Sequence, residues 1–155
     1  MFYHSFESLE ALFLESMEQY FRQSPHFKLS QFSEYDSPLA LLTQVFKETC
    51  EARTSDSLHR GCMAVNSVSE IIGANDKLDP FVTYAVHDSI NCFEALLESR
   101  VSKGELTANT ESRQLALALQ NTLIGLNTMS KVVTSEQELW GAVKSILVAL
   151  NIYRD

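Results

Sequence analysis

Apolar residues recur at intervals of three and four along most of the 155-residue chain, the spacing that places them on one side of an α-helix. Short runs rich in Ser, Pro, Gly, Asn and Asp separate the apolar segments. The predicted helices span about residues 8–23, 37–53, 60–72, 79–103, 110–133 and 135–151. Residues 26–36 show no clear period and are predicted to form a loop or a short turn. The pattern therefore predicts an all-α domain of about six helices.

Helix-capping residues support the boundaries of three of these segments. Ser8 stands before the first apolar stripe as an N-cap. Ser37-Pro38 and Asp79-Pro80 each place a capping residue before a proline in the first turn. The chain has only 5 Gly and 3 Pro, too few for the many turns of an all-β fold. Its length suits a single domain.

The last two predicted helices carry an apolar band wider than one neighbouring helix needs. A small monomer should not expose so large a contiguous apolar patch. Either both helices are central in the monomer, or they meet their copies in a twofold dimer. We favour a homodimer with a four-helix interface. The predicted interface residues are Leu115, Ala118, Thr122, Gly125, Met129, Leu139, Trp140, Val143, Ile146 and Leu147.

The charge balance argues against nucleic-acid binding by this chain alone. It has 12 Lys and Arg against 20 Asp and Glu, a formal net charge of −8. Binding to nucleic acid requires several basic side chains to neutralise phosphates, and here they are scattered. No apolar run reaches the roughly 18 residues of a membrane span, and no signal peptide opens the chain. We therefore expect a cytoplasmic protein with no membrane partner.

Motifs for catalysis or metal binding are absent from the sequence. There is no Gly-rich phosphate loop, nucleophile elbow or paired Cys-x-x-Cys, and the four histidines lie far apart. The three cysteines are expected to be free thiols in a reducing compartment, and Cys62 is better explained as a small apolar side chain than as a redox sensor. We predict no catalytic residue, no metal site and no cofactor, so the chain is not expected to be an enzyme.

Soft apolar side chains and a few polar groups fall near the middle of the predicted bundle. Such a mixture can line an adaptable pocket for a small molecule. For any single residue, core packing or solvent exposure is the commoner explanation. The candidate pocket residues taken from this pattern are Met17, Phe46, Met63, Asn66, Tyr84, His87 and Asn121.

The chain opens with the pattern Phe-Tyr-His-x-Phe, followed by Ser-x-Glu-Ala-Leu-Phe. It is carried by Phe2, Tyr3, His4, Phe6, Ser8, Glu10, Ala11, Leu12 and Phe13. The pattern resembles a junction in the TetR (tetracycline-repressor) family. There, the recognition helix of a helix-turn-helix ends and the helix that leads into the regulatory domain begins.

Two further segments resemble parts of TetR regulatory domains. The first is 60–66, with the Gly-Cys-x-x-x-Asn pattern, followed by Glu70 and Asp79-Pro80. The second is 104–106 with Leu115-Ala116 and Gly125-Leu126, which resembles the penultimate helix of the family. The order and spacing of the three segments identify the chain as similar to this family over nearly its whole length.

The resemblance implies a dimeric, all-helical transcriptional repressor controlled by a small apolar or amphipathic ligand. Residues 1–7 would be a remnant of the recognition helix, with Tyr3 and His4 near DNA, and residues 8–155 the ligand-binding and dimerisation domain. The ligand cavity would lie between the first helix and the helices that contain Phe46, Met63, Tyr84 and Leu117. Ligand binding would shift the DNA-binding heads through the joining helix.

The chain also departs from the family pattern. It begins inside the recognition helix, so about 40 residues of a basic helix-turn-helix head would be missing. Glu7 and Leu9 replace residues that are usually small or basic, which weakens attraction to phosphate. Two hypotheses remain. Either a regulator has been truncated, with DNA as a partner only when its head is present, or the protein dimerises and binds a small molecule without any head. The reading frame upstream of Met1 would separate them.

Overall fold

The computed structural model describes residues 8–155, which form six α-helices and one 3-10 helix and contain no strand. The elements are α2 (Leu9–Gln23), η1 (Pro25–Glu34), α3 (Pro38–Thr54), α4 (Met63–Ile71), α5 (Asp79–Ser102), α6 (Ser112–Met129) and α7 (Glu136–Ala149). The predicted all-α fold is confirmed. The predicted remnant at residues 1–7, with Tyr3 and His4, lies outside the described residues.

Two of the predicted N-caps form as expected. The Ser8 hydroxyl accepts a hydrogen bond from the Ala11 amide at 3.1 Å. The Ser37 hydroxyl accepts one from the Ala40 amide at 3.4 Å, and Pro38 follows in the first turn. Each satisfies an amide that the first helical turn leaves without a backbone acceptor.

Asp79 has a different role from the cap that its position before Pro80 predicts. Leu78 is the N-cap of α5, and Asp79 is the first helical residue. The Asp79 carboxylate accepts from the Gly73 amide at 2.9 Å and from the Thr83 hydroxyl at 3.1 Å. It therefore ties the loop after α4 to the first turn of α5.

The main difference from the sequence prediction is η1, which occupies most of the stretch predicted to be a loop. Its backbone departs from helical angles at Gln31 (φ −114°, ψ 24°). Leu29 is completely buried and Phe32 packs against the core, so two apolar side chains fasten this irregular segment. Aperiodic apolar positions of this kind produce no helical signal in the sequence.

The helix predicted from residue 60 begins only at Met63. His59 and Gly61 both have positive φ, 48° and 74°. This left-handed conformation cannot continue into a right-handed helix. The chain therefore turns at 59–61 before α4 starts.

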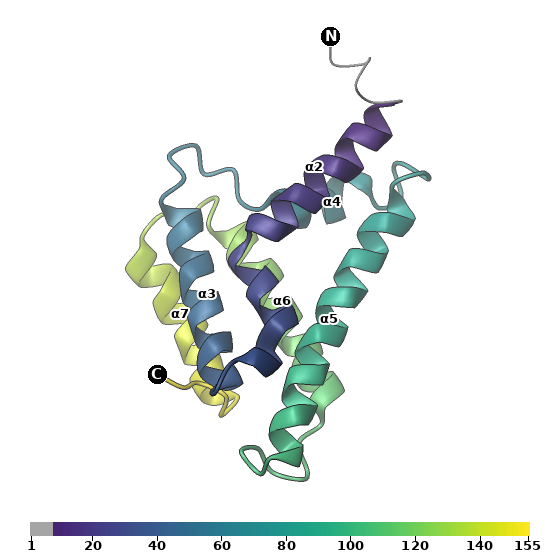
Figure 1. Ribbon diagram of the computed structural model, residues 1–155. Coiled ribbons are helices and arrows are strands. Elements are labelled where there is room, and N and C mark those ends of the chain that lie inside the picture. The colour runs from purple at the N-terminus through teal and green to yellow at the C-terminus, as the bar shows by residue number, and fades with distance from the viewer. Residues whose placement is uncertain (1–7) are drawn as a thin grey trace.

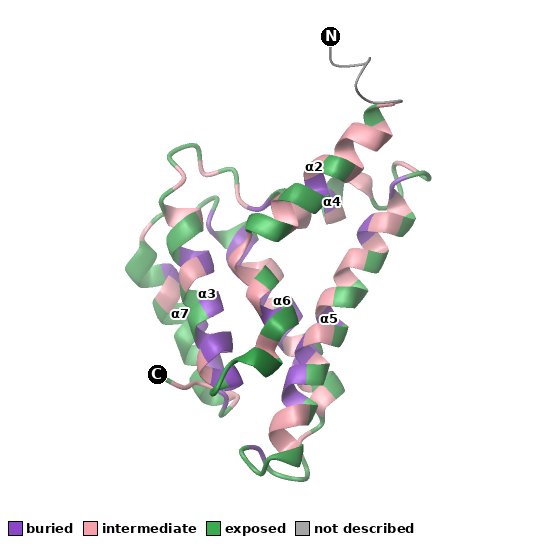
Figure 2. Cartoon of the chain, viewed as in Figure 1, coloured by how far each residue is buried: buried purple, intermediate pink, exposed green. Residues whose placement is uncertain are grey.

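Figure 1 shows α3 and α7 side by side on one flank, α5 on the other, and α2 crossing above α6. The core lies where α3, α5, α6 and α7 meet, and the buried positions face inward in Figure 2. The Phe46 and Phe93 rings are stacked there, 6.0 Å between centroids. The carboxyl-terminal tail joins this core, with Ile152 completely buried and the Arg154 amide donating to the Thr43 hydroxyl at 3.1 Å.

The structure corrects part of the predicted dimer interface. Leu139, Val143 and Leu147 are buried within this chain, where α7 packs on α3. Leu115 and Trp140 also pack against the core. Much of the wide apolar band is therefore used inside the monomer. The other predicted interface residues, which are exposed or partly exposed, are Ala118, Thr122, Gly125, Met129 and Ile146.

The outward surface of α7 carries a group of small side chains beside larger ones such as Glu136, Glu138 and Lys144. The exposed residues there include Gly141, Ala142, Ser145, Val148 and Ala149.

Among residues 8–155, no helix has both the length and the apolar character needed to cross a bilayer.

Candidate functional site

A cavity of about 310 Å³ lies among α2, η1, α4, α5 and α6, with α3 at one side. This volume is within the range of pockets that hold small organic molecules. Only three of its lining residues are exposed, Phe27, Ser30 and Asp88, so the cavity opens between η1 and α5. Its wall is mostly apolar and includes Met17, Phe21, Val65, Val68, Val82, Val86, Leu123 and Ile124.

One cluster of polar side chains at the cavity is a row of three hydrogen-bonded residues that joins η1, α5 and α6. The Ser89 hydroxyl lies 2.9 Å from Nε2 of His26 and donates to Oε1 of Gln120 at 2.5 Å. The His26 ring also meets the edge of Phe93, with centroids 5.4 Å apart. Nδ1 of His26 is shielded from solvent and has no hydrogen-bond partner among residues 8–155. Burial lowers the pKa of His26 to about 4, so the ring is neutral near pH 7.

A second polar group lies around Arg53, near the carboxyl end of α3. Its Nε donates to Oδ1 of Asn127 at 2.7 Å and its Nη1 to the Gly61 carbonyl at 3.2 Å. In residues 8–155, Arg53 forms no ion pair with a carboxylate. Gln120 and Asn127 are seven residues apart on α6, so the two polar groups are separated by about 10 Å along that helix.

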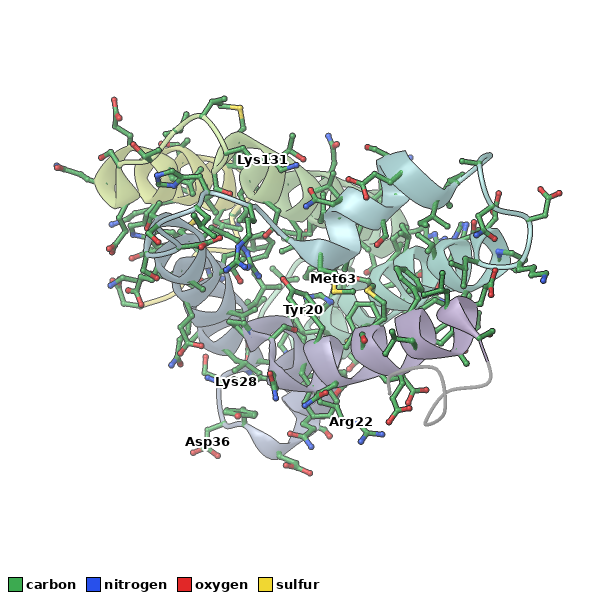
Figure 3. All side chains as sticks on the ribbon, turned by 90° about the horizontal axis from the view of Figure 1, so that it is seen from above. Tyr20, Arg22, Lys28, Asp36, Met63 and Lys131 are labelled. Carbon is green, nitrogen blue, oxygen red and sulfur yellow. The ribbon has the colours of Figure 1, made fainter. Side chains whose placement is uncertain are left out.

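A contact between a tyrosine and a cysteine joins α2 to the residue before α4. The Tyr20 hydroxyl donates to Sγ of Cys62 at 3.3 Å. The guanidinium of Arg53 lies 5.9 Å from the centroid of the Tyr20 ring, a cation–π distance. Figure 3 shows Tyr20 reaching from α2 toward Met63 at the start of α4. Burial is the largest cause that raises the pKa of Tyr20, to about 12, so the hydroxyl keeps its proton.

The chemistry of these groups favours binding over catalysis. Ser89 and His26 are close enough to form a nucleophile and base, but the Ser89 proton is directed at Gln120 and the depressed pKa makes His26 a weak base. Within the described part of the chain, no three His, Cys, Asp or Glu side chains are grouped closely enough to hold a metal ion.

Of the candidate pocket residues, the structure places Met17 in the cavity wall. Phe46 is completely buried in the core beside Phe93. Asn66 donates to the Arg60 carbonyl at 2.9 Å instead. Those that are exposed and outside the cavity are Met63, Tyr84, His87, Leu117 and Asn121.

The side of α5 that faces the cavity explains two of these differences. Val82, Val86 and Ser89 line the cavity, which leaves Tyr84 and His87 on the side of the helix that faces solvent. Tyr84 is accordingly 70% exposed. The polar residues that do reach the cavity include His26, Arg53, Ser89, Gln120 and Asn127. Nothing in the apolar periodicity marks them, because they come from four elements that meet only in the folded chain.

The family model of the tetracyclin repressor-like C-terminal domain matches residues 38–146. Two similar solved structures are of the TetR family transcriptional regulator CifR. One, a mutant with two substituted cysteines, is complexed with 26-bp double-strand operator DNA alongside the apo mutant; it has a TM-score of 0.81 and 25% identity, covering 95% of this chain and 77% of that one. The other, with three substituted cysteines and complexed with the same length of operator DNA, has a TM-score of 0.83 and 24% identity, covering 96% and 77%. The chain matches no curated protein.

Proposed function

The chain belongs to the TetR family through its C-terminal domain, and we propose that it is the ligand-binding and dimerisation part of a transcriptional regulator. A small apolar or amphipathic molecule would occupy the cavity and control DNA binding by a head joined to the amino-terminal end of α2. The observation that carries the proposal is the mostly apolar cavity built against α2, which opens between η1 and α5.

The wall of the cavity supports a coupling between ligand and α2. Met17, Tyr20 and Phe21 all come from the carboxyl-terminal half of that helix. A molecule that fills the cavity must contact them, and so favours one position of α2 over another. It controls DNA binding only if it binds the two positions of α2 with different affinities. Moving the equilibrium between the two positions from 1:99 to 99:1 requires a difference in binding free energy of about 5.5 kcal/mol.

A homodimer through α6 and α7 is the second part of the proposal. Leu117, Met129, Ile146 and Val148 are each at least 40% exposed on these two helices. Gly125 and Gly141 stand inside the helices, and a Cβ added at either would meet no atom of the described residues within 4 Å. A mid-helix glycine costs about 1 kcal/mol, and nothing inside this chain uses the space. A second copy that approaches closely would use it.

DNA binding is proposed only for a form that carries a basic head ahead of α2. The net charge of −8 gives this chain itself little attraction for phosphate. The name of the similar structures states that CifR binds operator DNA, and a dimer would read a site with matching twofold symmetry.

The experiment compares two forms of the protein: residues 1–155 alone, and residues 1–155 with whatever sequence precedes them in the gene. Both are incubated with a random duplex library, and the retained DNA is sequenced. We expect only the longer form to enrich a palindromic site. A site enriched by the short form would contradict the assignment of DNA binding to a head ahead of α2.

If neither form retains DNA while both dimerise and bind small molecules, the regulator proposal fails. The alternative of a dimerisation and ligand-binding protein without DNA-binding activity would then take its place. The same samples therefore separate the two functions.

A further inference from the structure

Arg53 is a cation in the cavity wall that has no anion beside it. Among the lining residues that the described chain contributes, it is the one lysine or arginine. No carboxylate of residues 8–155 lies within ion-pair distance of it. The side chain is half-buried, and a cation withdrawn from water without a counter-charge is costly. An anion bound in the cavity would supply that counter-charge.

The contacts of Arg53 place its guanidinium where α2, α6 and the start of α4 meet at the cavity. Nε and Nη1 donate to Asn127 and to the Gly61 carbonyl, and the group lies 5.9 Å from the centroid of the Tyr20 ring. Tyr20 and Asn127 both line the cavity, and so does Cys62, which follows Gly61 in the chain. The guanidinium is therefore held between three parts of the cavity wall.

The guanidinium also keeps donors free for a ligand. Of its five N–H groups, the structure uses Nε–H and one on Nη1. Nη2 makes no hydrogen bond to residues 8–155, yet the buried side-chain atoms that lack a partner there belong to His26 and His59. Nη2 is therefore not buried, and an acceptor can reach it. The planar fork of an arginine matches the two oxygens of a carboxylate.

The one acidic residue that the described chain adds to the cavity wall, Asp88, lies away from Arg53. Asp88 is exposed at the opening of the cavity, beside Ser89, which bonds to Gln120. Arg53 bonds to Asn127, two turns further along α6, or about 10 Å. Water and salt screen an exposed charge over about 8 Å, so Asp88 has little effect on an anion bound at Arg53.

We propose that the ligand of this cavity is a small amphipathic carboxylate, with its charged group on the guanidinium of Arg53 and its apolar body along Leu123 and Ile124. These two side chains line the cavity, about one turn of α6 before Asn127. The inference rests on the proposed function, because it names the ligand class of that same cavity. It also connects the ligand to α2, since the same guanidinium lies over the Tyr20 ring.

Three matched probes test the charge of the ligand: 4-propylbenzoate, 4-propylbenzamide and 4-propylbenzylamine. They share an apolar body and are anionic, neutral and cationic at pH 7.5. Binding to residues 1–155 is measured by titration calorimetry. We expect the benzoate to bind about tenfold more tightly than the amide, because hydrogen bonds between charged groups are the stronger ones, and the amine to bind most weakly. A benzoate that binds no better than either of the others overturns the proposal.

Two variants assign the preference to Arg53. Arg53→Met removes the charge and keeps an unbranched stem, and Asn127→Asp leaves Arg53 in place but supplies it with a carboxylate. Either change should abolish the preference for the benzoate. The control is Arg113→Met, which removes the same charge from a residue of α6 outside the cavity and should keep the preference. A preference that persists in folded Arg53→Met overturns the assignment.

A spectroscopic readout on the wild-type protein does not depend on how well the variants fold. In ¹H–¹⁵N spectra, the Nε–H signal of Arg53 should shift more on saturation with the benzoate than with the amide. Equal shifts, or none, contradict a carboxylate at the guanidinium.

The outcomes separate this inference from the proposed function. Probes that bind without preference for the anion overturn the carboxylate but leave the cavity and the proposed function intact. If none of the three probes binds, the proposed ligand class is wrong, whatever the library experiment shows. Failure of the proposed function itself would appear there, as DNA binding that no head provides or no DNA binding at all.

Discussion

Burial of the His26 imidazole couples the folding of this chain to pH. The pKa falls from 6.5 to about 4 in the folded state because burial penalises the charged ring. Between these two values the unfolded chain binds more protons than the folded one, so the free energy of unfolding decreases as the pH is lowered from 6.5. One pKa unit corresponds to about 1.4 kcal/mol, so the full effect is about 3 kcal/mol.

Urea denaturation of wild type and His26→Phe across pH 4–7 measures this contribution. The free energy of unfolding of wild type should fall relative to that of His26→Phe as the pH is lowered, because only wild type loses the His26 component. His87→Gln, altered at an exposed histidine, should follow the wild-type slope. Parallel pH profiles for wild type and His26→Phe would contradict the buried neutral ring.

Two of the cysteines are expected to react slowly with alkylating agents. Burial is the largest cause that raises the pKa of Cys50 to about 12 and that of Cys92 to about 11. Because the thiolate is the nucleophile, little of either thiol is reactive at pH 8. Iodoacetamide labelling, followed by peptide mass spectrometry, should be slower than in the urea-unfolded chain by about two orders of magnitude for Cys92 and about three for Cys50. Equal rates in the two states would show that these thiols are not protected.

At the scale of the elements, the turn before α4 depends on a close approach between backbones. Gly61 has φ +74°, and a Cβ there would come within 3.1 Å of the Asn127 carbonyl oxygen and 2.8 Å of Lys131 Cε. Lys131 can move because the atom lies far along a flexible side chain, but the Asn127 carbonyl belongs to α6. This contact holds the 59–61 turn against the carboxyl end of α6.

A matched pair of glycines isolates the contribution of that contact. Gly73 has nearly the same φ, +77°, but no atom of residues 8–155 lies within 4 Å of an added Cβ. Gly73→Ala should cost about 1–2 kcal/mol from the left-handed conformation alone. Gly61→Ala should cost about 1 kcal/mol more, because the added methyl also crowds α6. Chemical denaturation measures both, and equal losses would mean that the turn is not held by close packing.

The boundaries of helices were predictable where a nearby side chain caps the helix. They were unpredictable where the boundary depends on packing against elements that are distant in the sequence. Ser8 and Ser37 act locally, through an amide three residues ahead, so the sequence alone reveals them. The segment η1 depends on Leu29 entering a core made by distant elements. The same reason hides the cavity, because His26, Ser89 and Gln120 meet only after three elements have packed. Met17 was predictable because it belongs to the apolar stripe of its own helix.

At the scale of the whole molecule, the proposed dimer requires that the outer face of α7 carry no large charged side chain at Gly141. Gly141→Glu adds a charged side chain where the monomer has open space, so the fold of the single chain should be unaffected. In a close helix–helix interface the same carboxylate would be desolvated without a partner. Sedimentation velocity at micromolar concentration should therefore show a monomer for this variant and a dimer for wild type.

Ala95→Glu is the control for the dimer, since Ala95 is exposed on α5 and not on the two helices of the proposed interface. It should sediment as wild type does. A Gly141→Glu protein that remains dimeric would place the contact between copies on another surface, and the residues of α6 and α7 would have to be explained by the monomer alone.

The anchored carboxyl terminus has a practical consequence for work with this protein. Ile152 fills the core and the Arg154 amide is bonded to Thr43 at the beginning of α3. An exopeptidase that digests from this end should stall after removing Asp155, as long as the chain stays folded. For the same reason, a purification handle or fluorophore fused here needs a flexible spacer, so that the last residues can still dock on α3.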